Sequence, residues 1–218
     1  MVEITKKYKI GSRRFGLINW VGAWTLYKKE VLRFLIVWIQ TIFSPLISSL
    51  LFLLVLSLAI GADRGDILGV PFITFLAPGL ISMQVIQQSF SHSSSSFMIG
   101  KIQGNIVDLL DAPLSATEVT ISVTLAAVTR SVMIAAVSII TFMLLIEIQI
   151  TNYLTLIAFT FLSSFILGNV GIIAGLWSEK FDNMATVTNF VIVPLSFLSG
   201  TFYTIDKLPK FLQTISEF

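Results

Sequence analysis

The chain has few charged residues and no cysteine. Only 12% of its 218 residues are charged, whereas a soluble domain carries about a quarter, and 55% are hydrophobic, with a mean hydropathy of +0.90. So few charges cannot solvate the surface of a water-soluble fold, which indicates a protein that packs in lipid. The lack of cysteine excludes a disulfide framework, a thiolate nucleophile and a cysteine zinc site.

Motifs that carry catalysis are also missing. The phosphate-binding loop G-x-x-x-x-G-K-[ST] is absent, because Gly100 and Lys101 are followed by Ile102, so the chain does not hydrolyse ATP by itself. There is no H-E-x-x-H or G-x-S-x-G sequence, and the single histidine provides neither a metal site nor a Ser-His-Asp set. We therefore expect no enzyme, no cofactor in this chain and no nucleic-acid partner; an unusual intramembrane catalytic pair stays open.

Long uncharged runs dominate what is present. A helix needs about 20 apolar residues to cross ~30 Å of hydrocarbon. Five runs reach that length, and they predict an all-α polytopic membrane protein with spans at about 34–60, 74–99, 119–146, 153–177 and 184–204. Before the second span, Pro71 and Pro78 indicate an interfacial entry segment.

Basic residues gather at the start of the chain. Eight of the 14 lysines and arginines fall within residues 1–33, which the positive-inside rule places in the cytoplasm, with 62–66 outside and 100–118 inside. This head also carries apolar residues at helical spacing, with Thr25, Lys29 and Arg33 on the other side. The pattern predicts an amphipathic helix on the membrane surface, or alternatively a helix that buries its apolar stripe in a core. The stripe consists of Leu17, Trp20, Trp24, Tyr27 and Val31.

Polar residues inside the spans mark buried faces. Arg130 lies near the middle of the third span, where a charge costs about 2.5 to 3.5 kcal/mol, so we expect it to face protein. It either lines a translocation path or pairs with the second span, whose polar residues include Gln84, Gln87 and Gln88. His92 lies in the serine-rich stretch 89–97 and is expected to be a hydrogen-bonded packing residue, with a proton relay as the alternative.

Small residues on the fourth span predict close helix packing. Gly168, Gly171 and Gly175 place a small-xxx-small pair on one face. The partner helix is either in the same chain or, as a second option, in a second copy.

The loop 100–118 combines apolar and acidic residues. We predict a short amphipathic helix at 105–112 that a partner protein grips through Ile106, Leu109 and Leu110, or alternatively a plain connector. Ser115-x-x-Glu118 is a capping box that begins the next helix. The residues assigned to the partner contact are Asn105, Ile106, Asp108, Leu109, Leu110 and Asp111.

The order of these parts resembles a known family. Three segments carry the resemblance: F-L-A-P-G-L-I at 75–81, G-N-I-V-D-L-L-D-A-P-L at 104–114, and L-S-G-T-F-Y-T-I-D-K-L-P at 198–209. They resemble type-2 ATP-binding-cassette (ABC) permeases, the membrane subunits of bacterial exporters. The similarity covers nearly the whole chain, from the amphipathic head to residue 209.

The resemblance implies an architecture and partners. It implies an interfacial helix before six spans, a coupling helix near 105–112, and a location in the bacterial cytoplasmic (inner) membrane. Two copies of a separate ATPase subunit would bind ATP and Mg, and a second permease copy would complete the transporter. A re-entrant extracellular segment is implied at 199–209, and its motif residues are Ser199, Gly200, Phe202, Tyr203, Leu208 and Pro209. The expected sixth span is absent, which we interpret as truncation.

The resulting hypothesis is a permease subunit of an ABC exporter. Closure of the ATPases would push on the coupling helix and rock the permeases between inward-facing and outward-facing states. Two alternatives stay open. An ion-coupled secondary transporter would need ionisable residues in several spans, whereas Arg130 is the only lysine, arginine, aspartate or glutamate in the assigned spans. A membrane assembly subunit without transport activity is the other.

Overall fold

The structure, a computed structural model, describes residues 18–60, 67, 69–146, 148, 150 and 152–198. These residues are mainly helical, which confirms the prediction of an all-α protein. The elements in chain order are α1 (Trp20–Ile36), η1 (Ile39–Phe43), α2 (Ser44–Ile60), α3 (Phe72–Gln103), α4 (Ile106–Asp111), α5 (Ala116–Leu145), α6 (Tyr153–Trp177), α7 (Phe181–Val187), η2 (Thr188–Ile192) and α8 (Val193–Leu198), with η1 and η2 π-helical.

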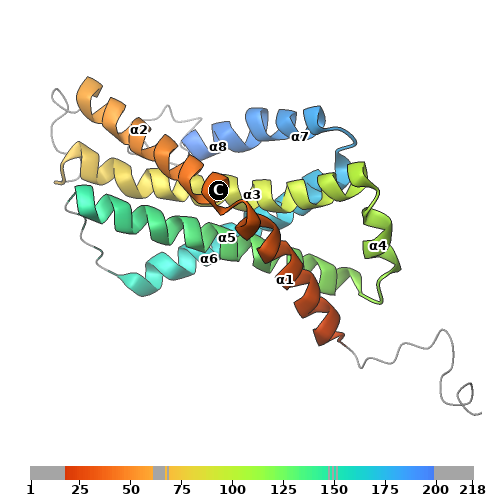
Figure 1. The fold of residues 1–218 in the computed structure, drawn as a ribbon. Helices are drawn as coiled ribbons and strands as arrows, with labels where there is room; N and C mark the ends of the chain where they lie inside the picture. Colours follow the sequence, from red (N-terminus) through yellow and green to blue (C-terminus); the bar gives the residue numbers. More distant parts are fainter. Residues whose placement is uncertain are drawn as a thin grey trace, which may run out of the picture.

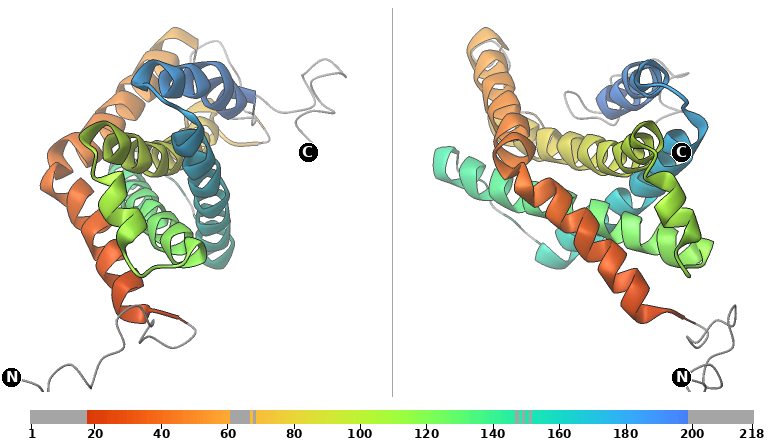
Figure 2. Two further views of the ribbon diagram at one scale, coloured as in Figure 1. Left: turned by 90° about the vertical axis from the view of Figure 1, so that its right-hand side faces the viewer. Right: turned by 45° about the vertical axis from the view of Figure 1, so that its right-hand side comes forward.

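Helix α3 is the centre of the bundle. It packs along α5 and α6, and it also contacts α2 and α8 (Figure 1). Helix α1 crosses α5 at an angle, and α4 lies at the end of the bundle where the chain passes from α3 to α5. Figure 2 shows the same arrangement from the α4 end.

Three helices in the described part of the chain are long and apolar enough to cross a membrane. They cover Ile39–Ala59, Ala116–Leu145 and Tyr153–Trp177, close to the first, third and fourth predicted spans. Helix α3 has the length but carries many polar residues, and it buries them against its neighbours. The second and fifth spans therefore stay predictions, the latter continuing beyond the described residues.

The predicted boundary between head and first span is wrong. Helix α1 continues to Ile36, and the break comes at Val37, where φ is −107° and ψ is 36°. Phe34 therefore belongs to α1, and its buried ring packs against the ring of His92. The hydroxyl of Thr41 donates to the carbonyl of Phe34 across the break, so the helix turns into the span without leaving this carbonyl unpaired.

Among residues 71–103, the predicted entry segment does not form an element separate from the second span. Pro71 is the N-cap of α3, and the helix continues through Pro78 to Gln103. A proline removes only one backbone donor, and neighbouring groups can compensate for that in a packed helix. Here the hydroxyl of Ser82 donates to the carbonyl of Pro78 at 2.9 Å.

Candidate functional site

Helix α4 lies where the sequence predicts it, flanked by Asn105 and Ala112. The turn before it needs Gly104, whose φ of +77° lies in the left-handed region that other residues rarely adopt. Asn105 does not cap the helix through its side chain; its amide donates to Gln103. Asp108 and Asp111 are exposed.

The apolar residues that α4 exposes differ from those predicted to contact a partner. Ile106 and Leu109 point inward and pack against a buried cluster formed by Leu26, Phe97, Val123 and Ile172. Val107 and Leu110 point outward, and Leu110 is 75% exposed. Since residues three apart share a face of a helix, each pair lies on its own side. The residues available to a partner are therefore Val107 and Leu110, with Asn105, Asp108 and Asp111 around them, which we call the α4 surface.

Asn19 connects the start of α1 to the loop after α4. Its side-chain oxygen caps α1 by accepting from the N–H of Gly22 at 3.0 Å, and its amide donates to the carbonyl of Pro113 at 3.2 Å. Its backbone N–H donates to the carboxylate of Glu118. Sequence reasoning missed this residue, although an asparagine immediately before a helix is a common N-cap.

Glu118 and Ser115 form the predicted capping box, which is confirmed. The hydroxyl of Ser115 accepts from the N–H of Glu118 at 3.3 Å, and the Glu118 carboxylate accepts from the N–H of Ser115 at 2.6 Å. The same carboxylate also binds Asn19, so one buried side chain holds the starts of both α1 and α5. A Cβ on Gly22 would lie 2.7 Å from the amide nitrogen of Asn19 and 2.8 Å from Leu114, so a larger residue would have to displace these side chains.

Helix α1 also carries a buried ion pair. Glu30 is only 2% exposed, and the Nε of Arg33 donates to its carboxylate at 3.0 Å. Arg33 continues into α3, where its guanidinium donates to the carbonyl of His92 at 3.1 Å. Arg33, which its spacing places on the side of α1 away from the aromatic residues, therefore turns inward, because a buried carboxylate attracts it.

His92 is fully buried beside this ion pair. Its Nε2 lies 3.7 Å from the Glu30 carboxylate, and its ring meets Phe34 edge to face with centroids 5.6 Å apart. Neither ring nitrogen has a hydrogen-bond partner among the described residues. His92 is thus packed in the core without the hydrogen bonds expected of it, and α1 brings an ionisable group to it from 62 positions away in the chain.

The other predicted polar residues lie earlier on α3 and on α5. Arg130 donates to the side-chain oxygen of Gln88 at 2.7 Å, as the pairing alternative predicts. Gln84 joins three helices, since it donates to the carbonyl of Pro45 and accepts from Ser138. Gln87 and Gln88 line a cavity of about 240 Å³ between α2 and α3. His92 does not line this cavity, so the predicted polar set divides into two sites.

The glycines of α6 face α3 within the chain. A Cβ on Gly171 would lie 2.5 Å from the carbonyl oxygen of Phe90, and one on Gly175 would lie 2.7 Å from that of Ser94. Gly168 is less tight, with Ser89 and Thr124 at 3.3 Å. This face is buried between α6 and α3, so the close packing predicted for these glycines occurs inside one chain.

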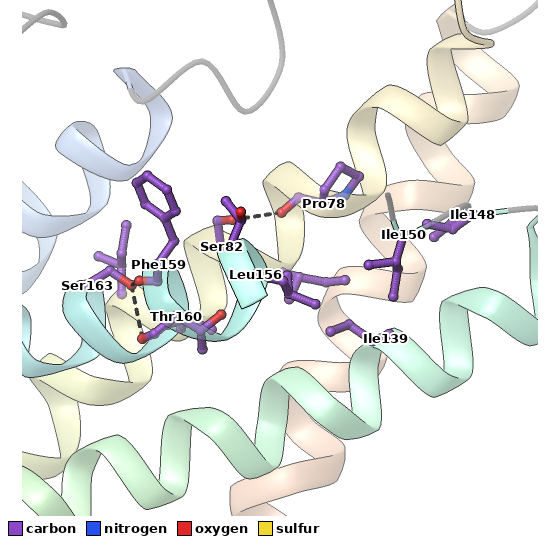
Figure 3. Close-up of a pocket in the computed structure, with 13 residues that line it drawn as sticks. Pro78, Ser82, Ile139, Ile148, Ile150, Leu156, Phe159, Thr160 and Ser163 are labelled. Carbon is purple, nitrogen blue, oxygen red and sulfur yellow. Dashed lines mark hydrogen bonds between the residues drawn. The ribbon is translucent and has the colours of Figure 1, made fainter. Parts of the chain in front are cut away.

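An apolar cavity of about 330 Å³ lies among α3, α5 and α6 (Figure 3). The hydroxyl of Ser82 donates to Pro78, and that of Ser163 to Phe159 at 2.7 Å, so both are bonded to their own helix. Isoleucines form much of the remaining wall. No converging set of polar groups among these lining residues suits catalysis.

Two predicted groups fall on residues outside the described part of the chain. They are Leu17 of the amphipathic stripe and the re-entrant segment 199–209.

Comparisons with known proteins agree on one family. The family model described as ABC-2 type transporter matches residues 22–218. The chain is 29% identical over 200 residues to the inner membrane transport permease YadH of Escherichia coli (strain K12), covering 92% of this chain and 78% of that protein. It is 22% identical over 210 residues to nodulation protein J of Rhizobium leguminosarum bv. trifolii, covering 93% and 77%. No solved structure matches.

Proposed function

Because this chain belongs to the ABC-2 type transporter family, we propose that it is the permease subunit of an exporter driven by ATP hydrolysis on a separate ATPase subunit. In this role the chain moves substrate and catalyses no reaction itself. The observation that carries the proposal is the α4 surface, where Val107 and Leu110 are exposed on a helix whose other side is anchored in the bundle.

The anchoring gives α4 a means of passing force to the bundle. Ile106 and Leu109 join it to the core, and Gly104 joins it directly to the end of α3. Through Pro113 and Glu118 the following loop is bonded to Asn19, at the start of α1. A push on the α4 surface by a closing ATPase would therefore move α1, α3 and α5 together, as a rigid-body switch requires.

The assembly and location follow from the same proposal. Two copies of the ATPase, which bind ATP and Mg, act on two permease chains, this one and a second copy or close relative. The complex lies in the inner membrane, as the name of the YadH relative states for that protein. The basic residues of the head support a cytoplasmic N-terminus, which puts α4 on the side where ATP is available.

The test is a double variant on the α4 surface, Val107→Ala with Leu110→Ala. Each apolar side chain buried at an interface contributes about 1.5 to 3 kcal/mol, so we expect at least a tenfold loss in pull-down of the cognate ATPase and loss of substrate-stimulated ATP hydrolysis in proteoliposomes. Membrane insertion should be unchanged.

Two single variants serve as controls. Leu144→Ala removes a leucine that is 82% exposed near the far end of α5 and should leave ATPase binding intact. Leu109→Ala should lower thermal stability, because its side chain packs inward. Unchanged association and unchanged coupling in the double variant would assign α4 to a plain connector and contradict the proposal.

A further inference from the structure

A second groove lies on the side of α1 that faces away from α4. It has a volume of about 380 Å³ and runs between α1, α5 and the side of α6. Aromatic residues of α1 form one wall and aliphatic residues of α5 form the other: Trp20, Trp24, Tyr27, Ile121, Leu125 and Val128. The groove is therefore made mainly of hydrocarbon and ring surface.

The hydroxyl groups in this groove are already used. The hydroxyl of Tyr27 bonds that of Thr129 at 2.9 Å, and Thr129 donates to the carbonyl of Leu125 at 2.8 Å. Ser122 lies within reach of two carbonyls, those of Ala23 and Glu118. A ligand of this groove would find few hydrogen bonds to make, which favours an apolar occupant.

The groove opens where a bilayer changes from hydrocarbon to headgroups. Helix α5 has 30 residues, about 45 Å, so it is longer than the ~30 Å hydrocarbon core, and the groove lies along its first half. Trp20 and Trp24 are 73% and 65% exposed, and tryptophan favours the headgroup level. Acyl chains are therefore the hydrocarbon that reaches the open side of the groove.

A positive charge stands beside this opening. Lys28 is exposed, follows Trp24 by one helical turn, and no ion pair joins it to any described residue. Lys29 points to the other side of α1. There it lines a separate groove between α1 and α4, and it lies 3.9 Å from the carboxylate of Glu30. Only Lys28 is therefore placed to meet a lipid phosphate near the aromatic wall.

We propose that this groove binds one anionic phospholipid of the leaflet in which α1 lies, with an acyl chain between α1 and α5 and the phosphate at Lys28. The volume is more than twice the ~150 Å³ of an apolar cavity that holds benzene, which is enough for part of one chain. The bound lipid lies beside the contacts that join the two helices, which include the bonds of Tyr27 to Thr129 and of Ser122 to the carbonyl of Ala23.

The headgroup is tested with two neighbouring lysines. The full chain is purified in mild detergent, exchanged into equal amounts of phosphatidylglycerol and phosphatidylcholine, and analysed by native mass spectrometry. The wild type should retain one phosphatidylglycerol in preference. Lys28→Gln should reduce that preference about fivefold, the factor equivalent to about 1 kcal/mol for a basic residue near an anionic membrane surface, whereas Lys29→Gln should keep it. Equal behaviour of the two variants would overturn the assignment of the phosphate.

The acyl chain is tested by filling the groove. Leu125→Trp should abolish retention of both lipids, whereas Leu144→Trp, on the same helix and outside the groove, should retain them. Thermal melting of both variants checks that they fold. Retention by Leu125→Trp overturns the proposal, and so does a change in oligomeric state without loss of lipid, which would assign the groove to a second copy. The measurement uses no ATPase, so a result that contradicts the lipid site does not bear on the proposed function.

Discussion

The two halves of α3 are both buried, but their neighbours differ. The first half, Phe72–Val85, packs in an apolar cluster that includes Leu53 of α2 and Phe142 of α5. The second half, Ser89–Met98, packs its serines and His92 against the glycines of α6 and the Glu30–Arg33 pair of α1. One helix therefore meets an apolar core at one end and a polar core at the other.

The two halves of α3 differ in how strictly they constrain the residues packed against them. An apolar core accepts side chains of similar volume with small losses, because its attraction depends on area and is not directional. The polar half requires close backbone approach at Gly171 and a matched charge at Glu30, where even small changes leave a clash or an unpaired group. We therefore expect the polar half to be the less tolerant of substitution.

The largest effect is expected at the buried ion pair. Arg33→Leu leaves the carboxylate of Glu30, whose side chain is only 3% exposed, without its guanidinium, and leaving a buried charge unpaired costs about 3 to 5 kcal/mol. Denaturant unfolding in detergent micelles measures the loss. The double variant Glu30→Leu with Arg33→Leu should recover most of the stability, because an apolar pair needs no charge balance. Equal destabilisation of the single and double variants would show that the charges are not what joins α1 to α3.

An intermediate effect is expected at the contact between α6 and α3. Gly171→Ala places a Cβ 2.5 Å from the carbonyl oxygen of Phe90, and overpacking of this kind costs about 1 to 3 kcal/mol. The melting temperature in detergent should fall accordingly. Gly168→Ala is the matched control, because its nearest neighbours, side-chain atoms of Ser89 and Thr124, are at 3.3 Å. Equal losses at the two positions would contradict the argument from close approach.

The smallest effect is expected in the apolar half. Leu76 is fully buried, and Leu76→Met keeps its volume, so we expect a loss below about 1.5 kcal/mol in the same melting experiment. Leu76→Ala should cost about 2 to 5 kcal/mol, which confirms that the site is packed. If Leu76→Met costs as much as Gly171→Ala, both halves depend on detailed fit and the contrast between them disappears.

The features that could be predicted from sequence depend on residues that are close to one another along the chain. The capping box of Ser115 and Glu118, the bounds of α4 and the spans of α5 and α6 all follow from local spacing or hydropathy. The exposed tryptophans of α1 also fit the predicted surface helix.

The features that sequence missed depend on partners far along the chain. The spacing of Arg33 places it away from the aromatic residues of α1, but it does not show the contacts with Glu30 and His92. Ile106 and Leu109 turn toward Leu26 of α1, a contact that no local pattern contains. Asn19 likewise gains its role only when Glu118 is beside it.

The bond between Asn19 and Glu118 also sets an order of events during synthesis. The two residues stand 99 positions apart, so at about 5 to 20 residues per second roughly 5 to 20 seconds separate their emergence from the ribosome. During that interval α1 has its own cap from Asn19, while two of the partners that fix its direction, Ser122 and Glu118, are not yet made. The first helix of the described chain to be translated therefore gains these two contacts only after the start of α5 has been made, and until then its exposed tryptophans are the groups that favour the membrane surface.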